Sequence, residues 1–347
     1  MFRPPAFWSA DRPYGLAKNL LWPAAQIYCG ASLLRRHLTH PVQVEKPVIC
    51  VGNVTLGGAG KTPVTLMLAD MLEKMGQRVA ILSRGYGGIE KGPIKVAPTH
   101  TARQIGDEAL MMAADFPVYV GRNRIETAQL ALAAGADILL MDDGLQNPTI
   151  ARDCNLLIVD STVGFGNGAL FPAGPLREKI QSALQRIQAV VLINESEKTE
   201  NTKQARADMC ALIEACHARN IPIFTAYFVP QNIPQARLLA YCGIGRPSKF
   251  FTMLEKNGAE LAACRAFNDH YFYKEKDAHT LLQQAKKLNA QIVTTKKDMA
   301  RLQRATPNSA LAELATHSQA IDIEVICEPL AELQSLLHHV CGKTNDR

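Results

Sequence analysis

The residues with the clearest chemical potential form one short run, TLGGAGKT, which follows the apolar stretch PVICVGNV at 47–54. Glycines let successive backbone N–H groups turn toward phosphate oxygens, and a helix starting there adds its own free N–H groups. The final lysine of such a loop reaches the β and γ phosphates, and the next hydroxyl holds Mg²⁺. The run therefore predicts a site for ATP and Mg²⁺, although Thr55 stands where the usual pattern has glycine. The residues of this predicted phosphate loop are Thr55, Leu56, Gly57, Gly58, Ala59, Gly60, Lys61 and Thr62.

A second chemical feature is the stretch ILLMDD at 138–143, in which four apolar residues lead into two aspartates. A buried parallel strand of this kind delivers a carboxylate to the sheet edge where a phosphate loop lies. We expect Asp142 to hold Mg²⁺, either directly or through water. Asp143 either shares that work or caps the following turn.

The elements that would position these residues alternate between strands and helices. Apolar strands are predicted at 47–54, 78–83, 136–143, 154–160, 189–194 and 221–227, with helices between several of them. Such alternation predicts an α/β fold of the P-loop NTPase type, with a mostly parallel sheet and helices on both faces. The proline-containing run VPQNIPQ at 229–235 predicts a hinge, after which a second, smaller α/β pattern begins. We therefore expect a nucleotide-binding domain at 47–228 and a smaller domain at 229–347 that contributes to the active site.

The first 46 residues differ from the rest of the chain. They hold both tryptophans, Trp8 and Trp22, and their largely apolar part ends at Arg35 and Arg36. One interpretation is an amphipathic helical segment that lies on an anionic membrane surface through residues 1–38. The other is a helix packed on the protein's own core. The longest apolar stretch, 20–34, is shorter than the roughly 20 residues that span a bilayer, so no transmembrane helix is predicted.

Bulk composition excludes several classes of protein. The formal net charge of +6 is too small and too dispersed to indicate nucleic-acid binding. The nine cysteines form no C-x-x-C pair and lie mostly in apolar runs, which is typical of reduced thiols in a cytosolic protein. The chain shows no secretory signal pattern.

Nine motifs occur in an order that resembles the tetraacyldisaccharide 4′-kinase (lipid A 4′-kinase) family. They are VGNVTLGGAGKT, LSRGYGG, GDEALM, VGRNR, MDDGLQ, FPAGPLRE, YCGIGRP, FNDHYFY and VTTKKD, between residues 51 and 298. The family usually carries a proline and a second histidine where this chain has Asn268 and Tyr271.

The resemblance implies transfer of the ATP γ-phosphate to the 4′-hydroxyl of tetraacyldisaccharide 1-phosphate, which forms lipid IVA in lipid A biosynthesis. It implies that Asp107 accepts the hydroxyl proton, that His270 orients Asp107, and that Glu108 assists Mg²⁺. It also implies a peripheral enzyme on the cytoplasmic face of the bacterial inner membrane; we expect a monomer. Because the expected boundary separates Asp107 from His270, we expect the two domains to close on ATP. Residues that suit phosphate or substrate contacts are Arg84, Arg122, Arg124, Arg177, Arg246 and Asp269. Lys297 and Asp298 are either site residues or an ion pair between domains.

Two other classes of function remain open from sequence. One is a regulatory P-loop ATPase, or a metallochaperone-type GTPase. Leu56 stands where the switch-type ATPases have a lysine, and the GTPase motif N-K-x-D is absent, so both are disfavoured. The other is a membrane scaffold that keeps nucleotide only for structure.

Overall fold

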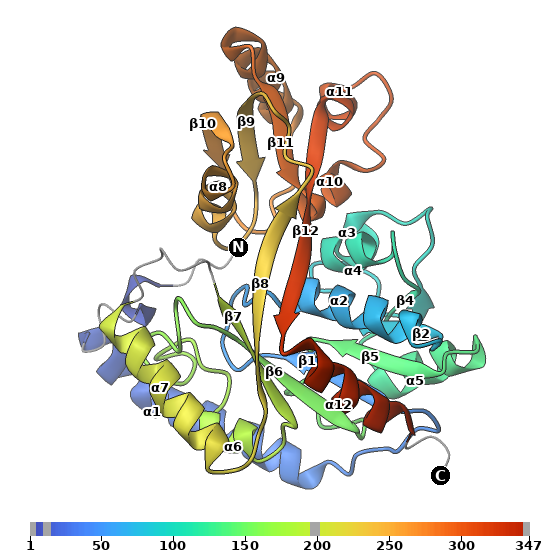
Figure 1. Ribbon diagram of the computed structural model, residues 1–347, viewed down its shortest axis with the longest axis vertical. Helices are drawn as coiled ribbons and strands as arrows, with labels where there is room; N and C mark the ends of the chain where they lie inside the picture. Colours follow the sequence, from blue (N-terminus) through green and yellow to red (C-terminus); the bar gives the residue numbers. More distant parts are fainter. Residues whose placement is uncertain (1–4, 10–14, 195–201, 343–347) are drawn as a thin grey trace. The chain divides into compact units, whose positions relative to one another are not determined.

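The computed structural model describes residues 5–9, 15–194 and 202–342, and the chain forms two compact units (Figure 1). Of the described residues, the larger unit contains those from 5 to 84, those within Gly121–Phe228, and 325–342. The smaller unit contains Gly85–Val120 and Val229–Glu324. The expected boundary at 228/229 coincides with one of the crossings between units. Residues 85–120 and 325–347, however, belong to the opposite units from those that the sequence suggested.

The larger unit is built on a parallel sheet with strand order β8-β7-β6-β1-β5-β2. Its strands are β1 (Val48–Gly52), β2 (Val79–Ser83), β5 (Ile138–Asp142), β6 (Cys154–Asp160), β7 (Ala189–Asn194) and the first part of β8 (Ile223–Gln231). Every residue of β1, β5 and β6 is buried, as expected for parallel strands covered on both faces. Because β1 lies between β5 and β6, the loops after β1 and β5 leave the sheet side by side.

Helices flank this sheet (Figure 1). They are α1 (Leu16–Leu38), α2 (Lys61–Lys74), α5 (Arg124–Ala133), α6 (Ile180–Leu184), α7 (Lys203–His217) and α12 (Leu330–Gly342), with a short 3-10 turn at Ala6–Trp8. The predicted fold class, a mostly parallel α/β sheet with helices, is confirmed. Of the N-terminal segment, residues 1–4 and 10–14 lie outside the described residues, whereas α1 is a continuous helix despite Pro23.

The smaller unit has its own parallel sheet, with order β10-β9-β11-β12. Its strands are β9 (Arg237–Cys242), β10 (Glu260–Ala266), β11 (Gln291–Thr295), most of β12 (Ser318–Glu328), and the antiparallel pair β3 (Ile94–Lys95) and β4 (Val118–Val120). Its helices are α3 (Ala102–Ile105), α4 (Asp107–Met112), α8 (Pro247–Lys256), α9 (Glu275–Leu288), α10 (Lys296–Leu302) and α11 (Ala310–His317). One apolar cluster packs α9 and α11 against the sheet, and another packs α8.

The predicted hinge at 229–235 is not an irregular linker throughout. Strand β8 continues through Val229 to Gln231, and the chain leaves the strand only after that residue. The change of unit thus falls inside a strand, and the turn-prone Asn232 follows it with a positive φ of 55°.

Candidate functional site

The phosphate loop, residues 55–62, joins β1 to α2 as predicted. Its entry is fixed by two backbone hydrogen bonds, since Leu56 N donates to Pro175 O (2.7 Å) and Arg177 N donates to Val54 O (2.7 Å). Gly60 precedes α2 with φ 82°, and a Cβ there would stand 2.7 Å from the ring of Phe228. Only glycine fits that position, and the turn leaves the first N–H groups of α2 without partners inside the helix.

Lys61 begins α2, and its side chain turns back across the loop. Its Nζ lies 3.3 Å from Asn53 Oδ1 and 3.6 Å from Asp143 Oδ1. Arg177 donates to the same aspartate at 3.0 Å. Burial acts to raise the pKa of Asp143, but the charges of Lys61 and Arg177 outweigh it and lower that pKa. An ionised carboxylate therefore holds two cations beside the loop, where they can exchange it for phosphate oxygens.

Asp142 is buried at the end of β5, where Thr65 Oγ1 donates to its Oδ1 at 3.1 Å. Thr62 lies one turn earlier on the same helix, half-buried. Hydroxyl and carboxylate oxygens are the donors that Mg²⁺ prefers, and one or two carboxylates beside substrate phosphates are sufficient. The described residues contain no group of three His, Cys, Asp or Glu side chains placed to hold a metal without a ligand. The oxygen donors of Thr62 and Asp142 are of the chemical type that could hold Mg²⁺. Thr65 was not predicted from the sequence, although its spacing of one helical turn from Thr62 could have indicated it.

The predicted arginines have different environments. Arg124 is buried at the start of α5. Burial lowers the pKa of its guanidinium, and the negative charge of Asp142 acts in the opposite direction. Arg84 and Arg122 are exposed residues of the larger unit, and Arg84 directly follows β2. Arg246 belongs to the smaller unit, at the N-terminus of α8.

The smaller unit brings Asp107 and His270 together, although they are 163 residues apart. His270 Nδ1 lies 3.0 Å from Oδ1 and 2.9 Å from Oδ2 of Asp107. The expectation that the two residues belong to different domains is wrong, because the segment carrying Asp107 folds with residues 229–324. His270 has a positive φ of 54°, an uncommon conformation for a side-chain-bearing residue and one that often occurs at functional sites.

Arg301, on α10, completes this cluster and was not found from sequence. Its side chain is fully buried, and its Nε donates to Asp107 Oδ2 at 2.7 Å. The other end of the guanidinium donates to Asp298 Oδ1 and Gly243 O. Asp298 also accepts a hydrogen bond from Tyr273 Oη at 2.7 Å. A buried arginine thus lies between two buried aspartates, and all three are fixed by further hydrogen bonds.

The electrostatics of this cluster keep Asp107 ionised. Burial acts to raise its pKa, but the hydrogen bond from His270 and the charges of Lys297 and Arg301 hold the pKa of Asp107 below its usual range. An ionised Asp107 accepts a hydrogen bond from the Nδ1–H group of His270, which leaves Nε2 as the other ring nitrogen. That nitrogen lies 3.5 Å from Lys297 Nζ and 3.8 Å from Asp269 Oδ2.

Lys297 links the remaining predicted residues of this unit. Its Nζ lies 3.0 Å from Glu108 Oε1 and 3.8 Å from Asp269 Oδ1. Lys297 and Asp298 therefore do not form ion pairs between domains. Lys297 pairs with Glu108 and Asp298 pairs with Arg301, and all four residues belong to the smaller unit. Glu108, predicted to assist Mg²⁺, belongs to a different unit from Thr62 and Asp142, and its carboxylate is bound to Lys297.

The parallel sheet, the glycine loop before α2 and the aspartate ending β5 define a P-loop nucleotide-dependent enzyme class. The family model described as "Tetraacyldisaccharide-1-P 4'-kinase" (LpxK) matches residues 17–340. The chain therefore belongs to the tetraacyldisaccharide-1-P 4′-kinase family. It is similar to the tetraacyldisaccharide 4′-kinase of Parvibaculum lavamentivorans, with 44% identity over 99% of this chain and 100% of that protein. The corresponding protein of Rhodospirillum centenum is 41% identical, over 99% of this chain and 98% of its own length.

A solved structure supports the fold. The crystal structure of LpxK from Aquifex aeolicus, described as an "apo" form in complex with ATP, matches with a TM-score of 0.71. It is 24% identical and covers 94% of this chain and 99% of that chain. The family resemblance inferred from the nine motifs is confirmed, and the chain is a member of a kinase family.

Proposed function

We propose that the protein transfers the γ-phosphate of ATP to the 4′-hydroxyl of tetraacyldisaccharide 1-phosphate and so forms lipid IVA. The observation that carries the proposal is the Asp107–His270 pair, in a chain of this family that also has a phosphate loop. A phosphate loop alone fits an ATPase equally well. A buried, charge-stabilised acid–base pair is what activation of a hydroxyl acceptor requires in addition.

The larger unit binds the nucleotide in this proposal. Backbone N–H groups of residues 55–62 surround the phosphates, and Lys61 exchanges Asp143 for the β and γ phosphate oxygens. Thr62 and Asp142 would hold Mg²⁺, which would supply positive charge to neutralise the charge that develops on the transferred group. Arg124 and Arg177 supply further positive charge, and Arg84 and Arg122 remain candidates for contacts to phosphate or substrate.

The smaller unit activates the acceptor. Asp107 and His270 act as one hydrogen-bonded pair that takes the proton of the 4′-hydroxyl. The hydroxyl meets the pair either at a carboxylate oxygen of Asp107 or at Nε2 of His270, with Asp107 orienting the ring in the second case. Asp269 and Arg246 are further candidates for substrate contacts.

The two possible proton acceptors predict different activities for the variants of this pair. If Asp107 takes the proton, His270→Gln keeps a measurable part of the activity, because the glutamine amide still donates to Asp107. If Nε2 of His270 takes it, His270→Gln loses as much as Asp107→Ala. Steady-state kcat of the two variants at saturating ATP separates the alternatives.

Helix α1 is the surface on which we propose that the protein meets an anionic membrane. Five of its eight exposed large apolar side chains, Leu16, Leu20, Ile27, Leu34 and Leu38, are exposed by 89, 83, 74, 58 and 68%, and the other three, Trp22, Tyr28 and Leu33, lie elsewhere around the helix. At 3.6 residues per turn these five positions fall within an arc of roughly 40°. The buried Ala25 and Cys29 lie on the opposite side of the helix. Among the described helices none is both long and apolar enough to cross a bilayer, so the stripe suits a helix lying in the interface.

The decisive experiment follows labelled phosphate from γ-labelled ATP into purified tetraacyldisaccharide 1-phosphate. We expect label only in the lipid, and none when the acceptor lacks its 4′-hydroxyl. Equal ATP consumption with and without the acceptor, and no labelled lipid, would instead support a regulatory ATPase.

A further inference from the structure

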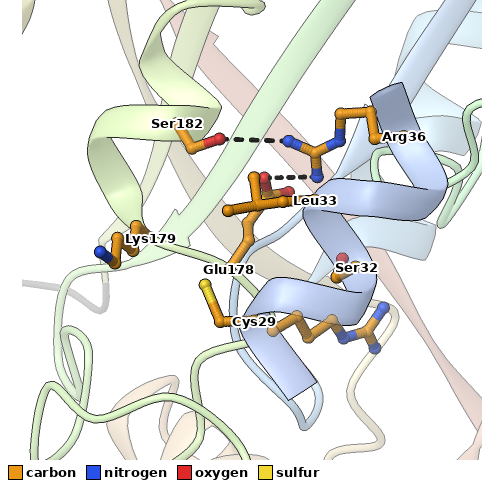
Figure 2. A pocket seen from close by; sticks show the side chains of 8 residues that line it. Cys29, Ser32, Leu33, Arg36, Glu178, Lys179 and Ser182 are labelled. Carbon is orange, nitrogen blue, oxygen red and sulfur yellow. Dashed lines mark hydrogen bonds and ion pairs between the residues drawn. The ribbon is translucent and has the colours of Figure 1, made fainter. Parts of the chain in front are cut away.

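The phosphate loop is joined to a neighbouring segment, residues 175–178, by its main chain. Pro175 O accepts from Leu56 N, Arg177 N donates to Val54 O, and Thr55 pairs with Leu176 as an isolated antiparallel bridge. Movement of this segment therefore changes the position of the loop's entry directly. The side chain of Glu178, the last residue of this segment, points toward α1 (Figure 2).

That side chain, Glu178, is a buried carboxylate shared by three groups. Arg36 of α1 donates to it at 2.9 Å and Arg186 at 2.5 Å. Its other oxygen accepts from Gln146 Nε2 at 3.1 Å, and the same nitrogen donates to Asn53 O at 2.8 Å. Asn53 is the residue whose side chain contacts Lys61. An unbroken series of polar contacts thus runs from α1 to the lysine of the phosphate loop.

Arg36 belongs to the inward side of α1 and not to its exposed apolar stripe. Its position on the helical wheel falls beside Ala25 and Cys29, roughly opposite Leu16 and Leu20. Figure 2 shows Arg36 reaching from α1 to Glu178 and to Ser182, whose Oγ is 3.1 Å away. The cavity around this contact holds about 50 Å³, room for a water molecule or two, and a larger one of about 260 Å³ is lined by Arg35, Arg36 and Gln146. The contact between Arg36 and Glu178 connects α1 to residues 175–178 within the larger unit.

We propose that Arg36 and Glu178 couple α1 to the phosphate loop, so that docking of α1 on an anionic lipid surface tightens the binding of nucleotide. The coupling rests on the proposed membrane contact of α1. When the exposed apolar side of α1 is buried in lipid, the helix is held with Arg36 facing the protein. This orientation keeps the Arg36–Glu178 pair formed. The pair in turn holds Gln146 against Asn53, and the loop is then ordered before nucleotide arrives.

Thermodynamic linkage makes this coupling reciprocal. Nucleotide must strengthen the binding of lipid by the same factor by which lipid strengthens the binding of nucleotide. Couplings between sites are commonly about five-fold or more, which titration resolves. A purely structural role for Arg36 would lower stability without producing two equal factors.

The test measures the affinity for a non-hydrolysable ATP analogue with Mg²⁺, in the absence and presence of vesicles of phosphatidylethanolamine and phosphatidylglycerol. Sedimentation measures vesicle affinity with and without the analogue. The variants are Arg36→Gln, Glu178→Gln and the control Arg35→Gln, which removes the same charge from the neighbouring position of α1. Arg36→Lys tests rescue, because lysine keeps the charge beside Glu178 and loses the bond to Ser182.

We expect the wild type and Arg35→Gln to show equal, reciprocal factors of about five or more. Arg36→Gln should bind vesicles as well as Arg35→Gln does but lose the factor, as should Glu178→Gln, while Arg36→Lys keeps part of it. If the wild type binds vesicles without any change in nucleotide affinity, or Arg36→Gln and Glu178→Gln keep the full factor, the coupling is wrong. If the wild type does not bind vesicles, the membrane contact fails as well. Transfer of label to detergent-dispersed acceptor then still tests the kinase proposal by itself.

Discussion

The two units carry reactive groups that are built in opposite ways. In the larger unit the phosphate loop relies on backbone N–H groups, a positive-φ glycine and one lysine, and most of the loop is at least partly accessible. In the smaller unit the Asp107–His270 cluster relies on side-chain charges, with Asp107, Asp298 and Arg301 all buried. A backbone site can be formed by a continuous run of residues. A buried charge cluster needs partners from several elements, because each ion must be compensated by another.

The sharpest way to separate the two regions is to remove the carboxylate of the cluster. We expect Asp107→Ala to lower kcat by about 10²–10⁴-fold, the usual contribution of a general base, while the affinity for ATP stays near that of the wild type. Steady-state kinetics and nucleotide titration on the same preparation measure both quantities. Turnover close to that of the wild type would remove Asp107 from the mechanism.

The next effect concerns the stability of the buried charges. Arg301→Gln leaves Asp107 and Asp298 without their shared cation, and we expect the free energy of unfolding to fall by about 3–5 kcal/mol. Urea unfolding of the wild type and of Arg301→Gln measures this loss.

The matched control is the ion pair of Arg78 and Asp137 at the surface, which has a similar fork geometry with Nε–Oδ2 at 2.7 Å. Arg78 is 71% exposed, so its ion pair is screened by water and Arg78→Gln should cost far less stability than Arg301→Gln. Equal losses in Arg301→Gln and Arg78→Gln would contradict the distinction between a buried and an exposed pair.

A smaller effect is expected from the glycine at the end of the loop. Gly60→Ala forces a side-chain-bearing residue into a positive φ and against Phe228, at an expected cost of roughly 1–3 kcal/mol in stability. Gly58→Ala is the control, because its added Cβ would meet no heavy atom within 4 Å. Thermal unfolding should give a lower melting temperature for Gly60→Ala than for Gly58→Ala. Equal melting temperatures would mean that the loop tolerates the strain.

The smallest effect is a dependence of stability on acid. The pKa of Asp107 is lower in the folded protein than in the unfolded chain, so its contribution is complete above the unfolded value and is lost as the pH falls. Between about pH 6 and pH 4 only the beginning of this loss is sampled, given an unfolded pKa near 3.9. The wild type should therefore lose slightly more stability over this interval than Asp107→Asn does. Parallel slopes for the two proteins would show that Asp107 is not held ionised by its partners.

The loop and its strand could be predicted because their determinants are local. The run at 154–160 and the run at 189–194 became β6 and β7 with unchanged bounds. Glycine spacing and an apolar strand specify the phosphate loop without reference to distant residues.

The buried cluster could be predicted only in part. Asp107 and His270 were identified through family motifs, whereas Arg301 lies in no motif and looks like an ordinary helical arginine in MARLQR. Its role depends on α10 packing beside α4, which is a tertiary fact. For the same reason the sequence assigned residues 85–120 to the wrong side of the 228/229 boundary, since an inserted segment has no local signature.

The most direct test of the account is a titration of the non-hydrolysable ATP analogue with Mg²⁺ into the wild type, Lys61→Ala and Asp107→Ala. We expect Lys61→Ala to lose most of its nucleotide affinity and Asp107→Ala to keep it, although both fail to label the lipid. If Lys61→Ala binds the analogue as tightly as the wild type and still phosphorylates the acceptor at the wild-type rate, the phosphate loop is not the nucleotide site.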